Sequence, residues 1–196
     1  MKKRAFIVHG WGGNPQEGWF PWLKSELEGK GFEVKAPELP ETDAPRIYNW
    51  VPALAKSVKN PDEQTYFIGH SMGCQTIVRY LETLPEGIKV GGAVFVAGFL
   101  NNLTGLKEEE KETGEHWMNS KLDLAKVKNH LPKSVAIFSD NDPFVPLNNR
   151  AEYENILGSK IMIEKNMGHF SGSDGVKKLP AVLDAILELT ELNKQN

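Results

Sequence analysis

The sequence predicts an α/β fold in which about six parallel strands form a doubly wound sheet with helices on both of its faces. Two observations carry this prediction. Short apolar runs alternate along the chain with longer segments of helical periodicity, which is the pattern of β-α-β units. Several of the apolar runs are continuous, as expected for strands that are buried on both sides. Since crossovers between parallel strands are right-handed, such units build one sheet between two layers of helices.

Six short runs are the predicted strands, because they are apolar or β-branched and end at glycine, proline or polar turn residues. They are residues 4–8, 32–36, 65–68, 93–97, 135–139 and 160–163. The second run is the weakest, since Pro37 and Pro40 stop it. Between the runs, apolar residues recur at helical spacing. The predicted helices are residues 21–30, 47–58, 72–84, 148–157 and 179–192.

One long segment, residues 99–133, interrupts this alternation, and its part 107–115 is highly charged. The segment is either a solvated excursion on the surface or a small cap over a pocket. The second interpretation follows from its place after a strand, because ligand sites in parallel sheets lie at the carboxyl ends of the strands.

Length and composition exclude several classes of protein. The chain has 196 residues, enough for one domain over residues 1–196 with a sizeable core. Its net charge is -3, whereas a nucleic-acid-binding surface normally has an excess of basic residues. The one cysteine, Cys74, excludes an intrachain disulfide. No apolar run approaches the ~20 residues of a membrane span. Residues 5–8 are too short for the apolar part of a signal peptide, roughly 7–15 residues, so we expect a cytoplasmic protein.

The strongest chemical signal is the sequence GHSMG at residues 69–73, which follows a predicted strand and opens a predicted helix. This is the G-x-S-x-G pattern of a nucleophile elbow in the context that it requires. The sharp turn strains the backbone of the serine, and side chains two residues before or after it would collide with neighbouring backbone. The alternative is an ordinary glycine-rich turn. We interpret Ser71 as a nucleophile, with the N–H group of Met72 available to bind developing negative charge.

A second glycine-rich loop, residues 9–14, follows the first predicted strand. Acyl transfer needs a second N–H donor from such an upstream loop, and Trp11 is the candidate. The glycines also suit a plain turn. We interpret His9 as a structural residue whose ring holds the loop.

A nucleophilic serine needs a base, and the base needs an acid that orients it. Of the five histidines, His169 follows the last predicted strand, at the same sheet edge as the elbow, whereas the turn carries His70 away from Ser71. Asp140 and Asp142 both follow the fifth predicted strand, and period-two alternation places them on the same side. Either can instead shape the turn.

The residue before a proline favours an extended backbone, and Asp142 precedes Pro143. That context favours Asp142 as the acid. The order Ser71, Asp142, His169 along the chain is one that serine hydrolases use. We expect these side chains to meet at one edge of the sheet, with a serine–histidine hydrogen bond of ~2.6–3.2 Å.

These motifs resemble those of the α/β-hydrolase superfamily, and more narrowly those of the small YdeN-like serine hydrolases, the group that includes retinoblastoma-binding protein nine. The matching segments are VHGWGG at 8–13, GHSMG at 69–73, SDNDPFVP at 139–146 and GHF at 168–170. The resemblance spans nearly the whole chain and implies that Ser71, Asp142 and His169 are the catalytic triad. It also implies a compact sheet with the strand order 2-1-3-4-5-6. The antiparallel strands that precede the first loop in larger members are then absent.

Residues and resemblance together predict a serine hydrolase that cleaves small carboxylic esters or related acyl compounds through an acyl-enzyme, with a small acyl molecule as its partner and no cofactor or metal ion. A peptidase or thioesterase would use the same triad. Outside enzymes, the alternative is a protein-binding module on the same scaffold. Cys74 is expected to be a small buried side chain. The aromatic residues that either line a substrate pocket or belong to the core are Trp11, Trp117, Phe144 and Phe170.

Overall fold

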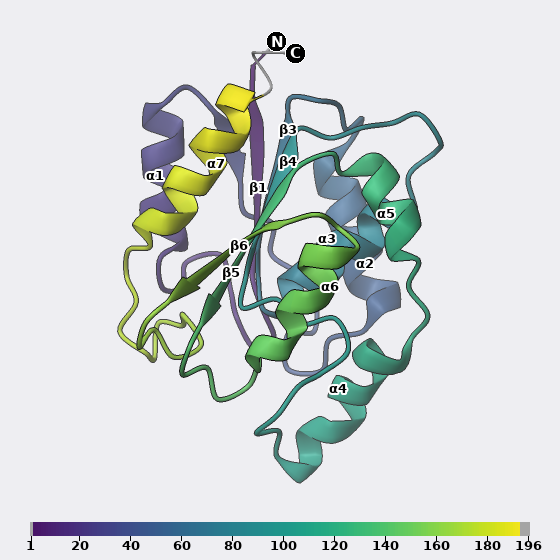
Figure 1. The fold of residues 1–196 in the computed structure, drawn as a ribbon, viewed down its shortest axis with the longest axis vertical. Coiled ribbons are helices and arrows are strands. Elements are labelled where there is room, and N and C mark those ends of the chain that lie inside the picture. The colour runs from purple at the N-terminus through teal and green to yellow at the C-terminus, as the bar shows by residue number, and fades with distance from the viewer. Residues whose placement is uncertain (1, 193–196) are drawn as a thin grey trace.

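The computed structural model describes residues 2–192, and a six-stranded parallel sheet forms its centre (Figure 1). The strands are β1 (Arg4–Val8), β2 (Glu33–Lys35), β3 (Thr65–His70), β4 (Gly92–Val96), β5 (Ser134–Ser139) and β6 (Lys160–Glu164). They lie in the order β2-β1-β3-β4-β5-β6, and every neighbouring pair is parallel. The predicted fold class and strand order are therefore confirmed. Because β1 lies between β2 and β3, the chain turns in opposite directions after β1 and after β3, and such a switch point is where parallel sheets bind ligands.

Helices cover both faces of the sheet (Figure 1). On one face lie α1 (Phe20–Gly29) and α7 (Pro180–Leu192); on the other lie α2 (Ile47–Val58), α3 (Met72–Glu82), α5 (Leu124–His130) and α6 (Arg150–Asn155). The helix predicted over 47–58 has the bounds that the structure shows. The helix predicted over 148–157 is instead a short 3-10 turn, η1 (Leu147–Asn149), followed by the shorter α6.

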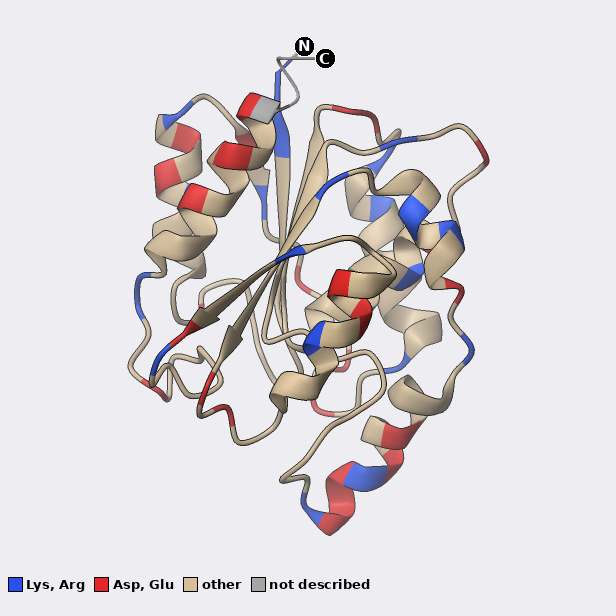
Figure 2. Ribbon diagram, viewed as in Figure 1, with Lys and Arg blue, Asp and Glu red and all other residues tan. Residues whose placement is uncertain are grey.

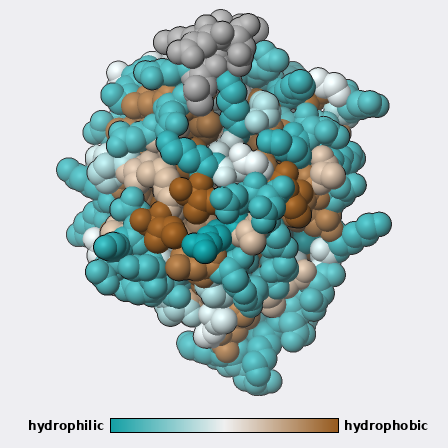
Figure 3. All heavy atoms as spheres, in the orientation of Figure 1, coloured by the Kyte–Doolittle hydropathy of each residue, from teal (hydrophilic) through white to brown (hydrophobic). Residues whose placement is uncertain are grey.

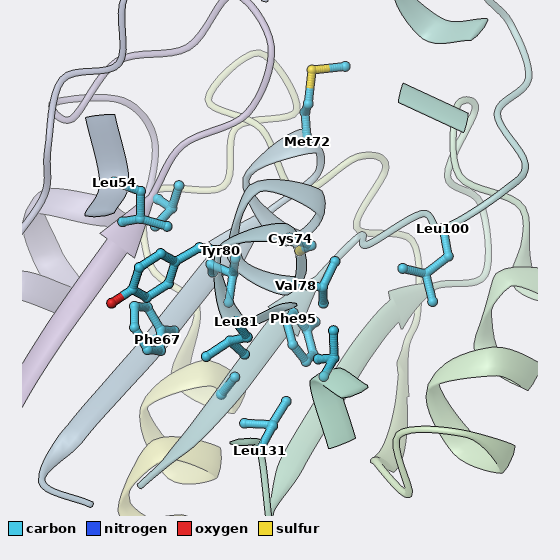
Figure 4. Close-up of a cluster of buried hydrophobic side chains, with 14 of the residues drawn as sticks. Leu54, Phe67, Met72, Cys74, Val78, Tyr80, Leu81, Phe95, Leu100 and Leu131 are labelled. Carbon is cyan, nitrogen blue, oxygen red and sulfur yellow. The ribbon is translucent and has the colours of Figure 1, made fainter. Parts of the chain in front are cut away.

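Two hydrophobic cores lie on the two faces of the sheet, because successive side chains of a strand point to opposite sides. In β1, Ala5 and Ile7 belong to the core under α1 and α7. Phe6 and Val8 belong to the core under α2 and α3, part of which Figure 4 shows around α3. This burial on both sides explains the continuous apolar runs of the sequence, and it holds α3, the helix that follows Ser71, firmly against the sheet.

The segment 99–133 contains α4 (Glu108–Asn119) as well as α5. The buried guanidinium group of Arg79 on α3 donates hydrogen bonds of 2.8–3.2 Å to three backbone oxygens near the end of α4, those of Trp117, Ser120 and Lys121. These bonds anchor the C-terminal end of α4. Its first turn carries acidic side chains, and Figure 2 shows this concentration of acidic residues at the lower end of the molecule.

Strand β6 lies at the edge of the sheet and has no fully buried residue. Ile163 of this strand is 44% exposed, and Figure 3 shows hydrophobic side chains among the polar ones on this face. Across residues 2–192, no helix combines the length and the hydropathy that crossing a bilayer requires.

Candidate active site

Ser71 lies in the sharp turn between β3 and α3 that the GHSMG sequence predicts. Its backbone angles, φ 52° and ψ -120°, lie in a region that residues other than glycine rarely adopt. Such strain costs of order 1–3 kcal/mol and persists only where the surrounding structure imposes it. Here the backbone N–H of Ser71 donates to Val96 O at 2.9 Å, and Ser71 O accepts from Cys74 N at 2.9 Å. The turn is thus held by hydrogen bonds to both β4 and α3.

Close backbone contacts explain the two glycines of this turn. A Cβ on Gly73 would lie 2.2 Å from Val8 O, and a Cβ on Gly69 would lie 2.9 Å from the backbone of α3. Both distances are well below van der Waals contact, so a side chain at either position would force the backbone to move. A Cβ on Gly10 would lie 3.0 Å from Ser71 Cβ, which shows that the loop after β1 packs directly on the nucleophile turn.

His169 and Asp142 form a hydrogen-bonded pair. His169 Nδ1 lies 2.9 Å from Asp142 Oδ2 and 3.1 Å from Oδ1, and only 1% of the Asp142 side chain is exposed. Asp142 Oδ1 also accepts from the backbone N–H groups of Phe144 and Val145, at 2.8 and 3.0 Å. These bonds orient the carboxylate. Because a carboxylate accepts, Nδ1 of His169 carries the proton, and Nε2 is the nitrogen that can receive one.

Asp140 has a different partner. Its Oδ1 accepts from the backbone N–H of Asn166 at 2.8 Å, and the next residue, Asn141, accepts from Gly168 N at 2.8 Å. These bonds join the loop after β5 to the loop after β6. The structure therefore brings Asp142, rather than Asp140, against the ring of His169.

Two ring N–H groups hold the backbone of the loop that carries His169. His70 Nε2 lies 2.7 Å from His169 O, and Trp19 Nε1 donates to Phe170 O at 3.0 Å. A carbonyl oxygen only accepts, so His70 Nε2 carries a proton. Burial, and secondarily the charge of His169, lower the pKa of His70 to about 3, which keeps the His70 ring neutral. The sequence argument set His70 aside as a base and missed this contact with the loop.

Asp174 holds the same loop from within. Its Oδ2 accepts from His169 N at 3.0 Å and from the backbone N–H and hydroxyl of Ser171, at 2.9 and 2.6 Å. Burial raises the pKa of Asp174, but these hydrogen bonds outweigh it and bring the pKa below its usual value. The sequence carries only one sign of this role, an aspartate that follows a serine by three residues in a glycine-rich turn.

The backbone N–H groups of Met72 and Trp11 are available as donors. Within residues 2–192, neither donates a hydrogen bond to another segment of the chain. Met72 opens α3, where an N–H group has no acceptor inside the helix. The loop around Trp11 is held by other groups, since Gly12 N donates to Thr42 O at 2.8 Å.

A cavity of about 450 Å³ opens at the nucleophile turn. Ser71 and His169 line it together with Trp11 and Phe144, two of the aromatic residues predicted for a pocket. The segment 99–133 supplies an apolar wall made of Phe99, Leu103 and Leu106. The volume lies in the range of small-molecule sites.

Ser71 and His169 share this cavity without being hydrogen-bonded. Within the described residues, no hydrogen bond joins Ser71 Oγ to the His169 ring, so the expected bond is not formed in this structure. Hydrogen bonds between a nucleophile and its base are often long without substrate and tighten in the complex.

The prediction that Trp117 and Phe170 line the pocket is wrong. Both side chains are fully buried, and neither reaches the cavity. Trp117 packs on Trp50, with ring centroids 5.8 Å apart, and its N–H donates to Pro45 O at 2.9 Å. Phe170 belongs to the core under α1 and α7. Large aromatic side chains gain most by full burial, and here the tertiary packing provides it.

The structural interpretations of His9 and Cys74 are confirmed. His9 Nε2 accepts from Leu39 N at 3.2 Å, and burial lowers the pKa of the His9 ring. Cys74 is buried on α3, where burial raises the pKa of its thiol. Neither side chain lines the cavity.

Comparison with known proteins gives a family match and several similar chains. The family model described as "Serine hydrolase" matches residues 5–188. The chain is 28% identical over 186 residues to YdeN of Bacillus subtilis (strain 168), covering 95% of each chain. It is 28% identical over 174 residues to the serine hydrolase RBBP9 of Rattus norvegicus, covering 87% of this chain and 89% of the relative. The crystal structure of the ydeN gene product from B. subtilis superimposes with a TM-score of 0.89 at 26% identity, covering 97% of this chain and 100% of that one.

A more distant structure shares the fold alone. Est1E from Butyrivibrio proteoclasticus with bound ferulic acid has a TM-score of 0.73 at 14% identity, covering 96% of this chain and 90% of that one. The family match spans nearly all of the strands and helices described above, and the sheet is that of the α/β hydrolases. The chain belongs to the serine hydrolase family.

Proposed function

We propose that the protein hydrolyses small carboxylic esters or related acyl compounds, with Ser71 as nucleophile, His169 as general base and Asp142 as the acid that orients it. One observation carries the proposal: the buried Asp142 carboxylate binds His169 Nδ1 at the edge of a cavity that Ser71 also lines. A nucleophile on a strained turn, a base with a free nitrogen and an oriented acid are the parts that acyl transfer needs.

In the first half of the reaction, Ser71 Oγ attacks the carbonyl carbon while His169 Nε2 takes the hydroxyl proton. Negative charge develops on the carbonyl oxygen, where the N–H groups of Met72 and Trp11 stabilise it. The bond to the leaving alcohol then breaks. His169 gives its proton to that alcohol, and the acyl group remains on Ser71.

In the second half, a water molecule attacks the acyl-enzyme and His169 Nε2 takes the water proton. The second tetrahedral intermediate collapses, the carboxylic acid leaves, and the proton returns to Ser71 Oγ. Asp142 accepts the hydrogen bond from His169 Nδ1 and stabilises the imidazolium that forms in each half.

The segment 99–133 acts as a small cap on a single α/β-hydrolase domain in this proposal. Leu103 and Leu106 of the segment line the cavity, which a solvated excursion would not do. Arg79 anchors the far end of α4 to α3, the helix that follows Ser71. In this proposal the cap shields the acyl group from bulk water.

Labelling with a fluorophosphonate probe tests the assignment. Wild-type protein should react at Ser71, and Ser71→Ala should lose both labelling and ester hydrolysis while keeping its circular dichroism spectrum. Ser25→Ala, which removes an exposed serine from α1, is the matched control and should label normally. Labelling that persists in Ser71→Ala contradicts the nucleophile. A folded wild-type protein that neither labels nor cleaves esters contradicts the enzyme and favours a protein-binding module.

A further inference from the structure

The cavity beside Ser71 has an acidic side. Three acidic residues line it, Asp43, Glu109 and Glu110, and no lysine or arginine of residues 2–192 lines it with them. Asp43 and Glu109 are exposed and Glu110 is half-buried, so they lie at the open side of the cavity. They come from two separate segments, the loop before α2 and the first turn of α4. Charges of one sign along a cleft give it a potential that raises the local concentration of oppositely charged ligands.

The neighbouring cations do not neutralise these carboxylates. Within the described chain, none of the three acids forms an ion pair, whereas the nearby Arg46 is paired with Glu112 at 2.7 Å. Lys111 pairs with Glu108, which does not line the cavity. In the part of the chain that the structure describes, no ion pair therefore offsets the negative charge of these three residues at the cavity.

Helix capping explains only part of this arrangement. Glu110 Oε2 accepts from Lys107 N at 2.8 Å, and acidic residues in a first turn interact favourably with the helix dipole. Asp43 is not on a helix. Its backbone oxygen accepts from Trp11 Nε1 at 3.0 Å, which holds Asp43 beside the loop proposed to bind the oxyanion. Helix stability gives no reason for a carboxylate there.

The cavity carries independent signs of a ligand. Ser71 is 9% exposed, lines the cavity, and its hydroxyl has no hydrogen-bond partner among residues 2–192. The opposite chemistry is present as well, since Phe99, Leu103 and Leu106 form an apolar wall. Trp11 and Phe144 also line the cavity, and aromatic rings attract ammonium groups.

We infer that the substrate is a cationic acyl compound, an ester with an apolar part and an ammonium group, and that Asp43, Glu109 and Glu110 determine this specificity. The inference rests on the proposed function of Ser71. The apolar wall takes the hydrocarbon part, and the carboxylates attract the ammonium group. The same carboxylates disfavour anionic esters, because like charges repel.

Three butyrate esters of similar size test the inference. The alcohols are 2-(trimethylammonio)ethanol, 3,3-dimethylbutanol and 2-sulfoethanol, which are cationic, neutral and anionic; the first two have the same shape. Proton release gives kcat/KM for each ester. The ratio of cationic to neutral kcat/KM should be about 5- to 20-fold, from three partly exposed charge pairs of modest strength. Added salt should reduce this ratio, and the anionic ester should be the slowest.

Paired variants locate the effect. Glu109→Gln and, independently, Asp43→Asn should each lower the ratio of cationic to neutral kcat/KM about 2- to 5-fold. Glu108→Gln is the matched control, because it removes the same charge from the same helix turn without touching the cavity. It should change the ratio less than about twofold.

The outcomes separate the two proposals. Wild-type protein that labels with fluorophosphonate and cleaves the neutral ester, but with a cationic-to-neutral ratio of one or less, overturns the specificity alone. Equal effects of Glu108→Gln and Glu109→Gln, with no effect of Asp43→Asn, also overturn it. Protein that neither labels nor cleaves any of the three esters overturns the proposed function and the specificity with it.

Discussion

Replacing His70 tests how the loop that carries His169 is held. His70 Nε2 donates to His169 O at 2.7 Å, and its ring is packed against Trp19 and Phe20. We consider two variants. His70→Leu removes the donor and the titrating group. His70→Gln removes the titrating group but keeps an amide N–H at a similar reach, so the pair separates the hydrogen bond from the charge.

The magnitude follows from the pKa of His70, which burial lowers to about 3 in the folded protein. In the unfolded chain the pKa of histidine is ~6.5. Between these two values the unfolded state binds one more proton, so stability falls as pH falls through this window. At pH 5 the loss is about 2 kcal/mol relative to a pH well above 6.5, where the contribution is fully present.

Urea unfolding at pH 7 and pH 5 measures this effect. At pH 7, His70→Leu should be less stable than wild type by ~1–3 kcal/mol, because a buried carbonyl loses its donor. At pH 5 the difference between wild type and His70→Leu should shrink by about 2 kcal/mol, because wild type loses that much stability through His70 and the variant has no such ring to titrate. A small displacement of His169 is costly in catalysis, so kcat of His70→Leu should fall by roughly 10- to 100-fold. His70→Gln should retain more activity.

Two results would refute this reasoning. If the stabilities of wild type and His70→Leu differ by the same amount at pH 5 and pH 7, the His70 ring titrates alike in both states and is not buried neutral. If His70→Leu keeps full kcat while losing stability, the bond to His169 O is structural and does not position the base.

Two further predictions follow from the same geometry. Asp142→Asn should lower kcat by up to ~10⁴-fold, because the amide favours the wrong tautomer of His169. Asp140→Asn should lower kcat less than about tenfold, since its amide oxygen can still accept the backbone N–H that Asp140 binds. Measuring kcat of both variants tests this, and the reverse order would make Asp140 the acid. Gly73→Ala should lower the free energy of unfolding by about 3 kcal/mol or more, because its Cβ would lie 2.2 Å from a backbone oxygen. At Gly29 a Cβ would meet nothing within 4 Å, so the free energy of unfolding of Gly29→Ala should lie within about 1 kcal/mol of the wild-type value. Equal urea midpoints for the two variants would contradict the packing argument.

The fold and the elbow were predictable because their causes are local. Continuous apolar runs follow from strands buried on both faces, and the two glycines around Ser71 follow from a turn too tight for side chains. The pairing of His169 with an aspartate was predictable from chain order and from the rule that parallel strands end at one edge. The choice of Asp142 over Asp140 was supported by the proline that follows Asp142 and by the family resemblance, since alternation treats the two aspartates alike.

Other features depend on contacts that no local pattern encodes. An aromatic side chain suits a core and a pocket equally well, so only packing shows that Trp11 and Phe144 line the cavity whereas Trp117 and Phe170 do not. His70 reaches the loop of His169 across 99 residues of sequence.

The sequence by itself determined the parallel sheet, the nucleophile turn and the identities of the candidate nucleophile and base, because each depends on the periodicity or the backbone geometry of neighbouring residues. Only the tertiary structure decided which aspartate contacts His169. The carboxylate of Asp140 accepts a hydrogen bond from Asn166 N. The carboxylate of Asp142 is instead oriented by Phe144 N and Val145 N. It also decided which residues surround the cavity. Those contacts join residues far apart in the chain, and the free energy that selects among them comes from packing and hydrogen bonding of the whole fold.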